Sequence, residues 1–163
     1  MQQVKKVLVA LALSEYSQET FDFAADFARH NNAELIVVNV INSRDVESVQ
    51  TISSMGYNVD GDHYVKNIKQ ERRKILDTIL ATETTPEKIR CLFRVGNPIN
   101  ELLNVIVDEE IDVVVMGPKG RTDLETVLIG SVAEKVFRRS PATVISYRND
   151  KVAARLRKRI KHK

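Results

Sequence analysis

Residues 113–134 contain the stretch that decides the fold: VVVM at 113–116, GPKG at 117–120 and, after nine further residues, GSVAE at 130–134. The β-branched run at 113–116 predicts a buried strand, and the glycines that follow it predict a turn. Apolar residues then recur at the spacing of one helical face, at Ile129, Val132, Ala133, Val136 and Phe137. This order predicts a strand, a glycine-rich loop and an amphipathic helix.

The glycines and Ser131 allow two interpretations. A helix that begins at Ser131 offers free N–H groups and a partial positive charge, which suit a phosphate, and glycine lets the backbone approach a ligand closely. Ser131 and Glu134 also match a Ser-x-x-Glu capping box, which stabilises a helix start without any ligand. Gly117 and Gly120 are equally compatible with turn residues alone.

Strand-like and helix-like segments alternate along the whole chain. We expect a helix with Ser17 as its N-cap, a charged helix from about Val65, and a helix that has Pro98 in its first turn. Residues 42–62 are polar and contain two glycines, so we expect a long loop with at most a short helical turn. The expected strands are 4–11, 35–41, 89–95, 112–116 and 143–147.

Near-continuous apolar strands that alternate with helices predict one fold class. It is an α/β protein with a single doubly wound five-stranded parallel sheet and helices on both faces. Ligands of such sheets bind outside the carboxyl ends of the strands, where the strand order reverses. The chain has 163 residues, which is enough for one domain with its own core.

The formal net charge of +3 conceals two oppositely charged parts. Residues 151–163 hold seven Lys/Arg and no acid, and the rest of the chain holds 18 Lys/Arg against 22 Asp/Glu, a net of −4. The basic isoelectric point is therefore weak support for a nucleic-acid-binding domain.

Cys91 is the only cysteine and lies in an apolar run, which indicates a core thiol and excludes a disulfide within one chain. The three histidines show no metal-ligand spacing, and we expect no metal site formed by them. The apolar stretch 7–13 ends without a small-residue cleavage pattern, so we expect no signal peptide and a cytoplasmic protein.

The spacing Gly-x2-Gly-x9-Gly-Ser at 117–131 resembles the nucleotide-binding signature of the universal stress protein (UspA-like) family. The flanks are similar too: Met-Gly at 116–117, Ser-Val-Ala-Glu-Lys-Val after Gly130, and then Ser-Pro-Ala-Thr-Val. The opening Val-Leu-Val-Ala-x3-Ser-x2-Ser at 7–17 and the turn Gly96-Asn97-Pro98 also resemble the family pattern. The resemblance implies a universal stress protein domain at 1–148, followed by a basic C-terminal tail at 149–163.

The resemblance implies a Rossmann-like, adenine nucleotide alpha hydrolase-like fold with strand order 3-2-1-4-5. It implies a homodimer formed through the fifth strand, Thr143 to Tyr147, and an unknown protein partner. It also implies that ATP or another adenine nucleotide binds, with or without Mg²⁺. In nucleotide-binding members the adenosine borders the end of the first strand, which is Ala10 to Ala12 here. The other implied site residues are Val40 beside the adenine, Met116 and Gly117 opposite it, and Lys119, Gly120, Gly130, Ser131 and Val132 around the phosphates.

Three departures from the family pattern affect this site. Ala12 stands where the family usually has an aspartate that contacts the nucleoside and helps to set up the metal site. Pro118 lacks an N–H donor, and Asp123 brings a negative charge that Lys119 and Arg121 offset. We therefore expect an intact phosphate half and a degraded nucleoside half.

Three hypotheses for the function follow. The first is an ATP-binding universal stress protein, a homodimer in stress response or signalling whose nucleotide state modulates a partner. The second, supported by Ala12, is the same fold without nucleotide binding, acting as a dimeric interaction module. The third is a nucleic-acid-binding adaptor that uses the tail, although no aromatic residues accompany its basic ones. We expect no catalytic residues, because hydrolysis needs a positioned base and only Glu15 and Asp123 lie near the motifs.

The tail itself has two interpretations. Val152, Leu156 and Ile160 recur at i, i+4 and i+8, so the tail is either a frayed, solvated segment or a narrow amphipathic helix. Such a helix would contact an acidic partner, an anionic membrane surface or nucleic acid. We expect no core contact from residues 151–163.

Overall fold

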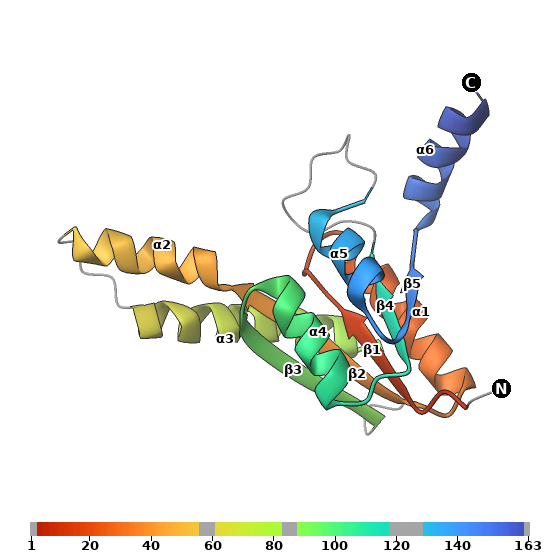
Figure 1. Cartoon of the computed structure of the whole chain (residues 1–163), viewed down its shortest axis with the longest axis horizontal. Coiled ribbons are helices and arrows are strands. Elements are labelled where there is room, and N and C mark those ends of the chain that lie inside the picture. Colours follow the sequence, from red (N-terminus) through yellow and green to blue (C-terminus); the bar gives the residue numbers. More distant parts are fainter. Residues whose placement is uncertain (1–2, 56–60, 83–87, 118–128, 162–163) are drawn as a thin grey trace.

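The computed structural model describes residues 3–55, 61–82, 88–117 and 129–161 (Figure 1). Strands and helices alternate through most of this range, as the sequence predicts. The strands are β1 (Lys6–Ala10), β2 (Glu34–Asn42), β3 (Ile89–Gly96), β4 (Val113–Met116) and β5 (Thr143–Ser146). The helices are α1 (Ser17–His30), α2 (Ser43–Ser54), α3 (Gly61–Leu80), α4 (Pro98–Asp108), α5 (Ser131–Arg139) and α6 (Asp150–Lys161).

The five strands form one parallel sheet in the order β3-β2-β1-β4-β5. Val7 of β1 is paired with Leu35 of β2 on one side and Val113 of β4 on the other. The chain proceeds from β1 outward to β3 and then returns to the far side of β1, so the order reverses between β1 and β4. The predicted doubly wound sheet is thus confirmed, and its reversal places the carboxyl ends of β1 and β4 side by side.

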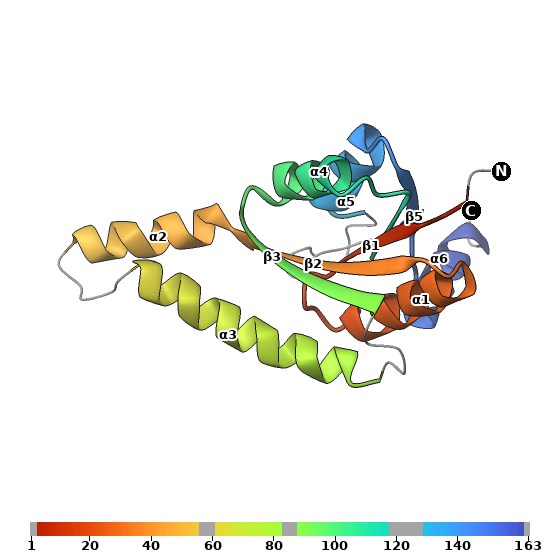
Figure 2. The same ribbon diagram turned by 90° about the horizontal axis from the view of Figure 1, so that it is seen from below.

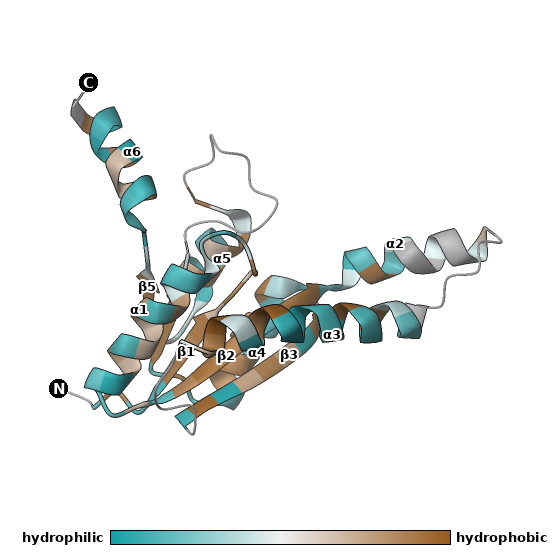
Figure 3. Cartoon of the chain, turned by 180° about the vertical axis from the view of Figure 1, so that it is seen from behind, coloured by the Kyte–Doolittle hydropathy of each residue, from teal (hydrophilic) through white to brown (hydrophobic). Residues whose placement is uncertain are grey.

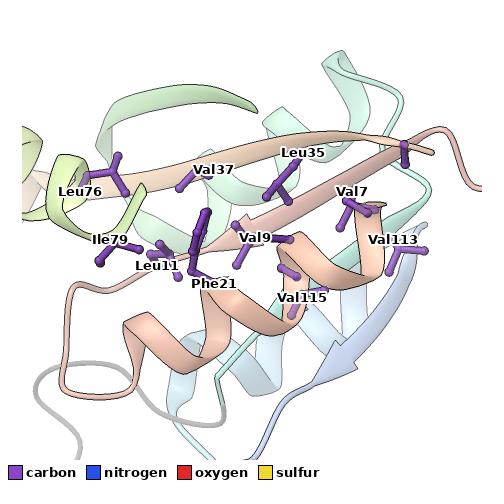
Figure 4. Packing of buried hydrophobic residues seen from close by; sticks show 14 residues of the cluster. Val7, Val9, Leu11, Phe21, Leu35, Val37, Leu76, Ile79, Val113 and Val115 are labelled. Atoms are coloured by element: carbon purple, nitrogen blue, oxygen red, sulfur yellow. The ribbon is translucent and has the colours of Figure 1, made fainter. Parts of the chain in front are cut away.

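Helices cover both faces of the sheet, with α1 and α3 on one face and α4 and α5 on the other (Figure 2). Because successive strand residues point to opposite faces, Val7 and Val9 contact the first layer while Leu8 contacts the second. Figure 4 shows the first layer, in which Leu76 and Ile79 of α3 lie near Leu11 and Phe21. Burial on both faces explains why the strands are almost continuously apolar.

The helix starts differ from the predicted caps at two serines. Ser17 and Ser131 are each the first residue of a helix, and the caps are Tyr16 and Gly130. Neither cap makes a side-chain hydrogen bond, so the predicted Ser17 cap is wrong and the capping-box interpretation of Ser131 is excluded. A capping serine must be extended just outside the helix, and at α5 Gly130 occupies that position, with φ −70° and ψ 153°.

Two further sequence predictions at helices have opposite outcomes. Pro98 is the first residue of α4, as predicted, and the Asn97 side chain caps this helix by accepting hydrogen bonds from the N–H groups of Ile99 and Asn100. On α5, Ala133 and Val136 are buried, but Phe137 of the predicted apolar face is exposed. Ile129 precedes the helix and is exposed as well.

Residues 42–62 are not the long loop that we predicted. Residues 43–54 form α2, and α3 already begins at Gly61, before Val65. The side chain of Asn42 accepts a hydrogen bond from the N–H of Arg44 (3.1 Å) and so supports the start of α2. α2 packs beside α3, and this pair extends away from the sheet (Figures 1 and 2). The apolar periodicity of α2 is weak because this projecting helix buries little surface against the core.

The C-terminal segment forms a helix, α6, and does not fray within the described residues. Asn149 caps it by accepting a hydrogen bond from the N–H of Val152 (3.0 Å). Val152 is only 5% exposed, so the expectation that this segment makes no core contact is wrong. Beyond Val152, α6 points away from the sheet and is mainly hydrophilic (Figures 1 and 3).

Within the described part of the chain, no helix combines the length and apolar character that crossing a membrane requires.

Candidate functional site

A pocket of about 250 Å³ lies at the carboxyl ends of β1, β2 and β4. This is the point where the strand order reverses, and open α/β sheets bind their ligands there. The sheet brings together residues that lie more than one hundred positions apart in the sequence. Six residues predicted from the sequence line the pocket: Ala10, Ala12, Val40, Met116, Gly117 and Val132.

The pocket has mainly apolar walls at the strand ends. These walls include Val38 and Val40 of β2, Met116 of β4 and Leu102 of α4. Pro98 and Val132 come from the first turns of α4 and α5, so two helix N-termini adjoin the pocket. A flat aromatic base suits apolar walls of this kind, and helix N-termini favour negative charge.

The first turn of α1 and the loop before it contribute hydroxyl groups that the sequence analysis did not assign. Ser14, Tyr16, Ser17 and Thr20 all line the pocket. The Ser17 hydroxyl accepts a hydrogen bond from the N–H of Ser14 (3.0 Å), and the Thr20 hydroxyl donates to the carbonyl of Tyr16 (2.8 Å). These bonds shape the loop that closes one side of the pocket.

A buried arginine from α3 also lines the pocket. Arg72 is 9% exposed, and its Nη1 donates hydrogen bonds to Oδ1 of Asn39 and to the carbonyl of Val40, both at 2.9 Å. Nδ2 of Asn39 in turn donates to the carbonyl of Leu11 at 2.7 Å. The network therefore ties α3 to the ends of β2 and β1, beside the residues predicted to border an adenosine.

The sequence analysis missed Arg72, although a signal was present. Arg72 follows Ile68 by four positions and precedes Leu76 by four, so a cation occupies the inward face of an amphipathic helix. Asn39 is likewise a lone amide inside an apolar strand. A buried polar group needs a hydrogen-bond partner, but sequence alone does not identify a partner more than thirty residues away.

The structure covers only part of the glycine motif. Lys119 and Gly120 lie outside the described residues, together with Pro118, Arg121 and Asp123. Gly130 is buried and Ser131 is exposed at the start of α5, whose next two residues, Val132 and Ala133, line the pocket. The assignment of phosphate contacts to these positions stays a prediction.

The charges around the pocket are unevenly distributed. Among the described lining residues Asp45 is the only carboxylate, and it is exposed in the first turn of α2, whereas Arg72 is buried. The described residues contain no group of three His, Cys, Asp or Glu side chains that could hold a metal ion. At nucleotide sites Mg²⁺ usually keeps several waters and takes one or two carboxylates together with the phosphates. The described lining offers the single carboxylate of Asp45 for this role.

Comparisons with known proteins agree with this architecture. A model of the universal stress protein family matches residues 3–148. Universal stress protein YxiE of Bacillus subtilis is 31% identical over 151 residues, covering 88% of this chain and 98% of its own. Universal stress protein MJ0577 of Methanocaldococcus jannaschii is 26% identical over 156 residues, covering 89% of this chain and 96% of its own.

Several solved structures share the fold at low sequence identity. The structure of MJ0577 superimposes with a TM-score of 0.73 at 23% identity and covers 91% of this chain and 100% of its own. UspA from Lactobacillus plantarum gives a TM-score of 0.69 at 22% identity, with 91% of this chain and 100% of its own covered. A universal stress protein in complex with cAMP gives 0.62 at 23% identity, covering 90% and 98% of the two chains.

Proposed function

Since the chain belongs to the universal stress protein family, we propose that it binds ATP or another adenine nucleotide in the pocket at the ends of β1, β2 and β4. In this proposal it is a cytoplasmic homodimer in stress response or signalling, and the bound nucleotide modulates an unknown protein partner.

One observation carries the proposal: the six predicted residues that line a single pocket at the reversal of the sheet. Val40 and Met116 supply apolar walls for a base, and the first turn of α5 supplies N–H groups toward its phosphates. A family member of the same fold was solved in complex with cAMP, an adenine nucleotide, and this supports the choice of ligand class.

Binding is a better description of the pocket than catalysis. Hydrolysis of a phosphate ester needs a positioned base or water-orienting group, usually together with a metal ion. Asp45, the carboxylate of the described lining, is exposed and lies at the start of α2. We therefore propose at most slow ATP hydrolysis.

A test of nucleotide binding begins with the purified full-length chain. Heating should release an adenine nucleotide that chromatography identifies, and the emptied protein should bind ATP in a calorimetric titration. The proposal would be contradicted if the preparation releases no nucleotide and the titration shows no heat of binding at millimolar ATP.

That negative result would favour the second candidate, a dimeric interaction module without a nucleotide. Ala12 is the observation in its favour, because it lines the pocket where the family usually has an aspartate and offers no polar side chain to a ribose. Both candidates are dimers and only the first binds a nucleotide, so calorimetry separates the two.

A further inference from the structure

We propose that the hydroxyl groups of Ser17 and Thr20, at the start of α1, bind a ribose hydroxyl of the nucleotide. They make the pocket prefer ribonucleotides to deoxynucleotides. The inference rests on the proposed function, because it concerns the ligand of the same pocket. It goes beyond that function by assigning the selectivity for the sugar to side chains of α1, for which the sequence predicts no ligand contact.

The two side chains are buried and both line the pocket. Ser17 is 4% exposed and Thr20 is 2% exposed. They lie three residues apart in the first turn of α1, so they share one side of the helix. Burying a hydroxyl costs free energy when its hydrogen bonds are not made. Any donor or acceptor that the protein leaves unused here is therefore available to a ligand.

The hydrogen bonds within the protein use only one role of each hydroxyl. Oγ of Ser17 accepts from the N–H of Ser14 (3.0 Å), and its O–H has no acceptor within the described residues. Oγ1 of Thr20 donates to the carbonyl of Tyr16 (2.8 Å), and in the described part of the chain no donor reaches its lone pairs. Such hydroxyls can both donate and accept. Ser17 thus offers a donor, and Thr20 offers an acceptor.

A hydroxyl group of the ligand matches this pair. It can accept a hydrogen bond from Ser17 and donate one to Thr20, whereas a carbonyl oxygen only accepts and an ammonium group only donates. Neither protein side chain is charged, so the pair gives no particular advantage to a phosphate. A ribose carries hydroxyl groups of this kind, and a deoxyribose lacks one of them.

The character of the walls directs the sugar toward α1. Val40 and Met116 belong to the apolar walls at the strand ends, which suit a flat base. The start of α1 contributes hydroxyl groups to the same pocket. In this binding mode the base lies against the strand ends and the phosphates point to the start of α5. The sugar that joins them directs a hydroxyl to Ser17 and Thr20.

The choice of ligands tests the selectivity on the full-length wild-type chain. Calorimetry compares ATP with 2′-deoxy-ATP and 3′-deoxy-ATP, each of which lacks one ribose hydroxyl. We expect at least one deoxynucleotide to bind about threefold to tenfold more weakly than ATP, because one neutral hydrogen bond is lost. Inosine triphosphate changes the base and keeps the ribose, so it shows whether the hydroxyl pair binds the base instead.

Two variants test the assignment to α1. Ser17→Ala removes the donor, and Thr20→Val removes the acceptor at nearly constant shape. Each should weaken ATP binding about threefold to tenfold and leave binding of the disfavoured deoxynucleotide within about twofold, so that the preference for ATP disappears. Thr20→Ser keeps the hydroxyl and should keep the preference.

The matched control is Thr78→Val on the exposed side of α3. The Thr78 hydroxyl donates to the carbonyl of Lys74, four residues earlier (3.1 Å), as that of Thr20 donates to Tyr16. Losing the same local hydrogen bond away from the pocket should leave every affinity within about twofold of wild type.

The ratio of affinities separates recognition from a structural role, because a distorted pocket would lose ATP and the deoxynucleotide equally. Equal losses in either variant, an unchanged preference in either, or a change confined to ATP against inosine triphosphate would overturn the role of α1 and leave nucleotide binding intact. If one variant does not fold, the other decides. Wild type that binds ATP and both deoxynucleotides equally would overturn the inference without any variant. Absence of binding by every nucleotide to wild type would overturn this inference together with the proposed function.

Discussion

At the residue scale, Gly130 is the position at which a side chain tests the predicted phosphate contact. It is buried, caps α5 and lies two residues before Val132, which lines the pocket. Its φ of −70° is open to any residue, so backbone strain does not explain a glycine here. The proposed nucleotide would explain it, because glycine lets a ligand approach the backbone closely. We predict that Gly130→Val abolishes detectable ATP binding by calorimetry while circular dichroism shows a folded protein.

Ser131→Ala should weaken ATP binding without abolishing it, in contrast to Gly130→Val. Loss of one charge-assisted hydrogen bond should weaken ATP binding by about 1–2 kcal/mol. Because Ser131 is exposed and follows the cap position, its stability cost should stay below about 0.5 kcal/mol rather than the larger value of a lost cap. Unchanged ATP affinity in both variants would show that the glycine motif of this chain is structural.

A second prediction at this scale concerns Glu109 at the end of α4. Its carboxylate pairs with the Arg90 guanidinium of β3 through Nη1–Oε1 (3.0 Å) and Nη2–Oε2 (2.5 Å). The hydrogen bond from Arg90 holds the pKa of Glu109 below its ordinary value of 4.5. The unfolded chain thus takes up the proton first, and the stability from this pair is present above pH 4.5 and lost as the pH falls below it.

We therefore expect Glu109→Gln to lower the melting temperature at pH 7 and to differ less from wild type at about pH 3. The effect at pH 7 should be at most about 1 kcal/mol, since the pair is partly solvated. Asp108→Asn, at the exposed neighbouring carboxylate, is the control and should not change the acid dependence. If Glu109→Gln lowers the melting temperature by the same amount at every pH, the acid dependence does not come from the pair of Glu109 with Arg90.

At the scale of elements, α6 is anchored at its base and free of the sheet further along (Figure 1). Val152 and Ile160 lie on the same face of this helix, eight residues apart, but Val152 is 5% exposed and Ile160 is 76% exposed. We predict that Val152→Ala lowers the free energy of unfolding by about 1–2 kcal/mol, through lost apolar burial and a small cavity.

Ile160→Ala removes a larger side chain from the same face and serves as the control. It should change the free energy of unfolding by less than about 0.5 kcal/mol in urea denaturation, because its side chain is already solvated. If both variants lower the free energy of unfolding equally, then α6 contacts the domain either along its whole length or not at all.

At the scale of the whole molecule, β5 is one open edge of the sheet. The N–H groups of Thr143 and Tyr147 donate to the carbonyls of Asp112 and Met116 along β4. Because strand residues alternate, the N–H groups of Val144 and Ser146 point to the open edge, where a second copy of the chain could pair.

We predict a homodimer by light scattering at micromolar concentration, and a monomer for Ser146→Pro. Proline removes an outward N–H donor and leaves the bonds to β4 in place. Ser146→Ala keeps the N–H and should remain dimeric, which separates loss of the donor from loss of the hydroxyl. A monomeric wild type, or a dimeric Ser146→Pro, would refute pairing through this edge.

The sequence by itself determined the order and type of most elements and the identity of six lining residues. The elements rest on local patterns: a strand buried on two faces must be apolar at nearly every position, and a helix on a sheet must be apolar once per turn. The six residues rest on the resemblance of the motifs to the universal stress protein family. The glycine spacing and the turn Gly96-Asn97-Pro98 are local as well. Local patterns of this kind can be recognised in the sequence without knowing which residues pack against them in the folded chain.

Only the tertiary structure decided what depends on partners distant in sequence. The adjacency of β1 and β4, which forms the pocket, comes from pairing between residues more than one hundred positions apart. The α2 helix went unrecognised because it packs mainly beside α3 and carries little apolar periodicity. Arg72 became part of the site because burial on α3 forces its guanidinium to find acceptors at the end of β2, and only the folded chain brings these acceptors within hydrogen-bonding distance.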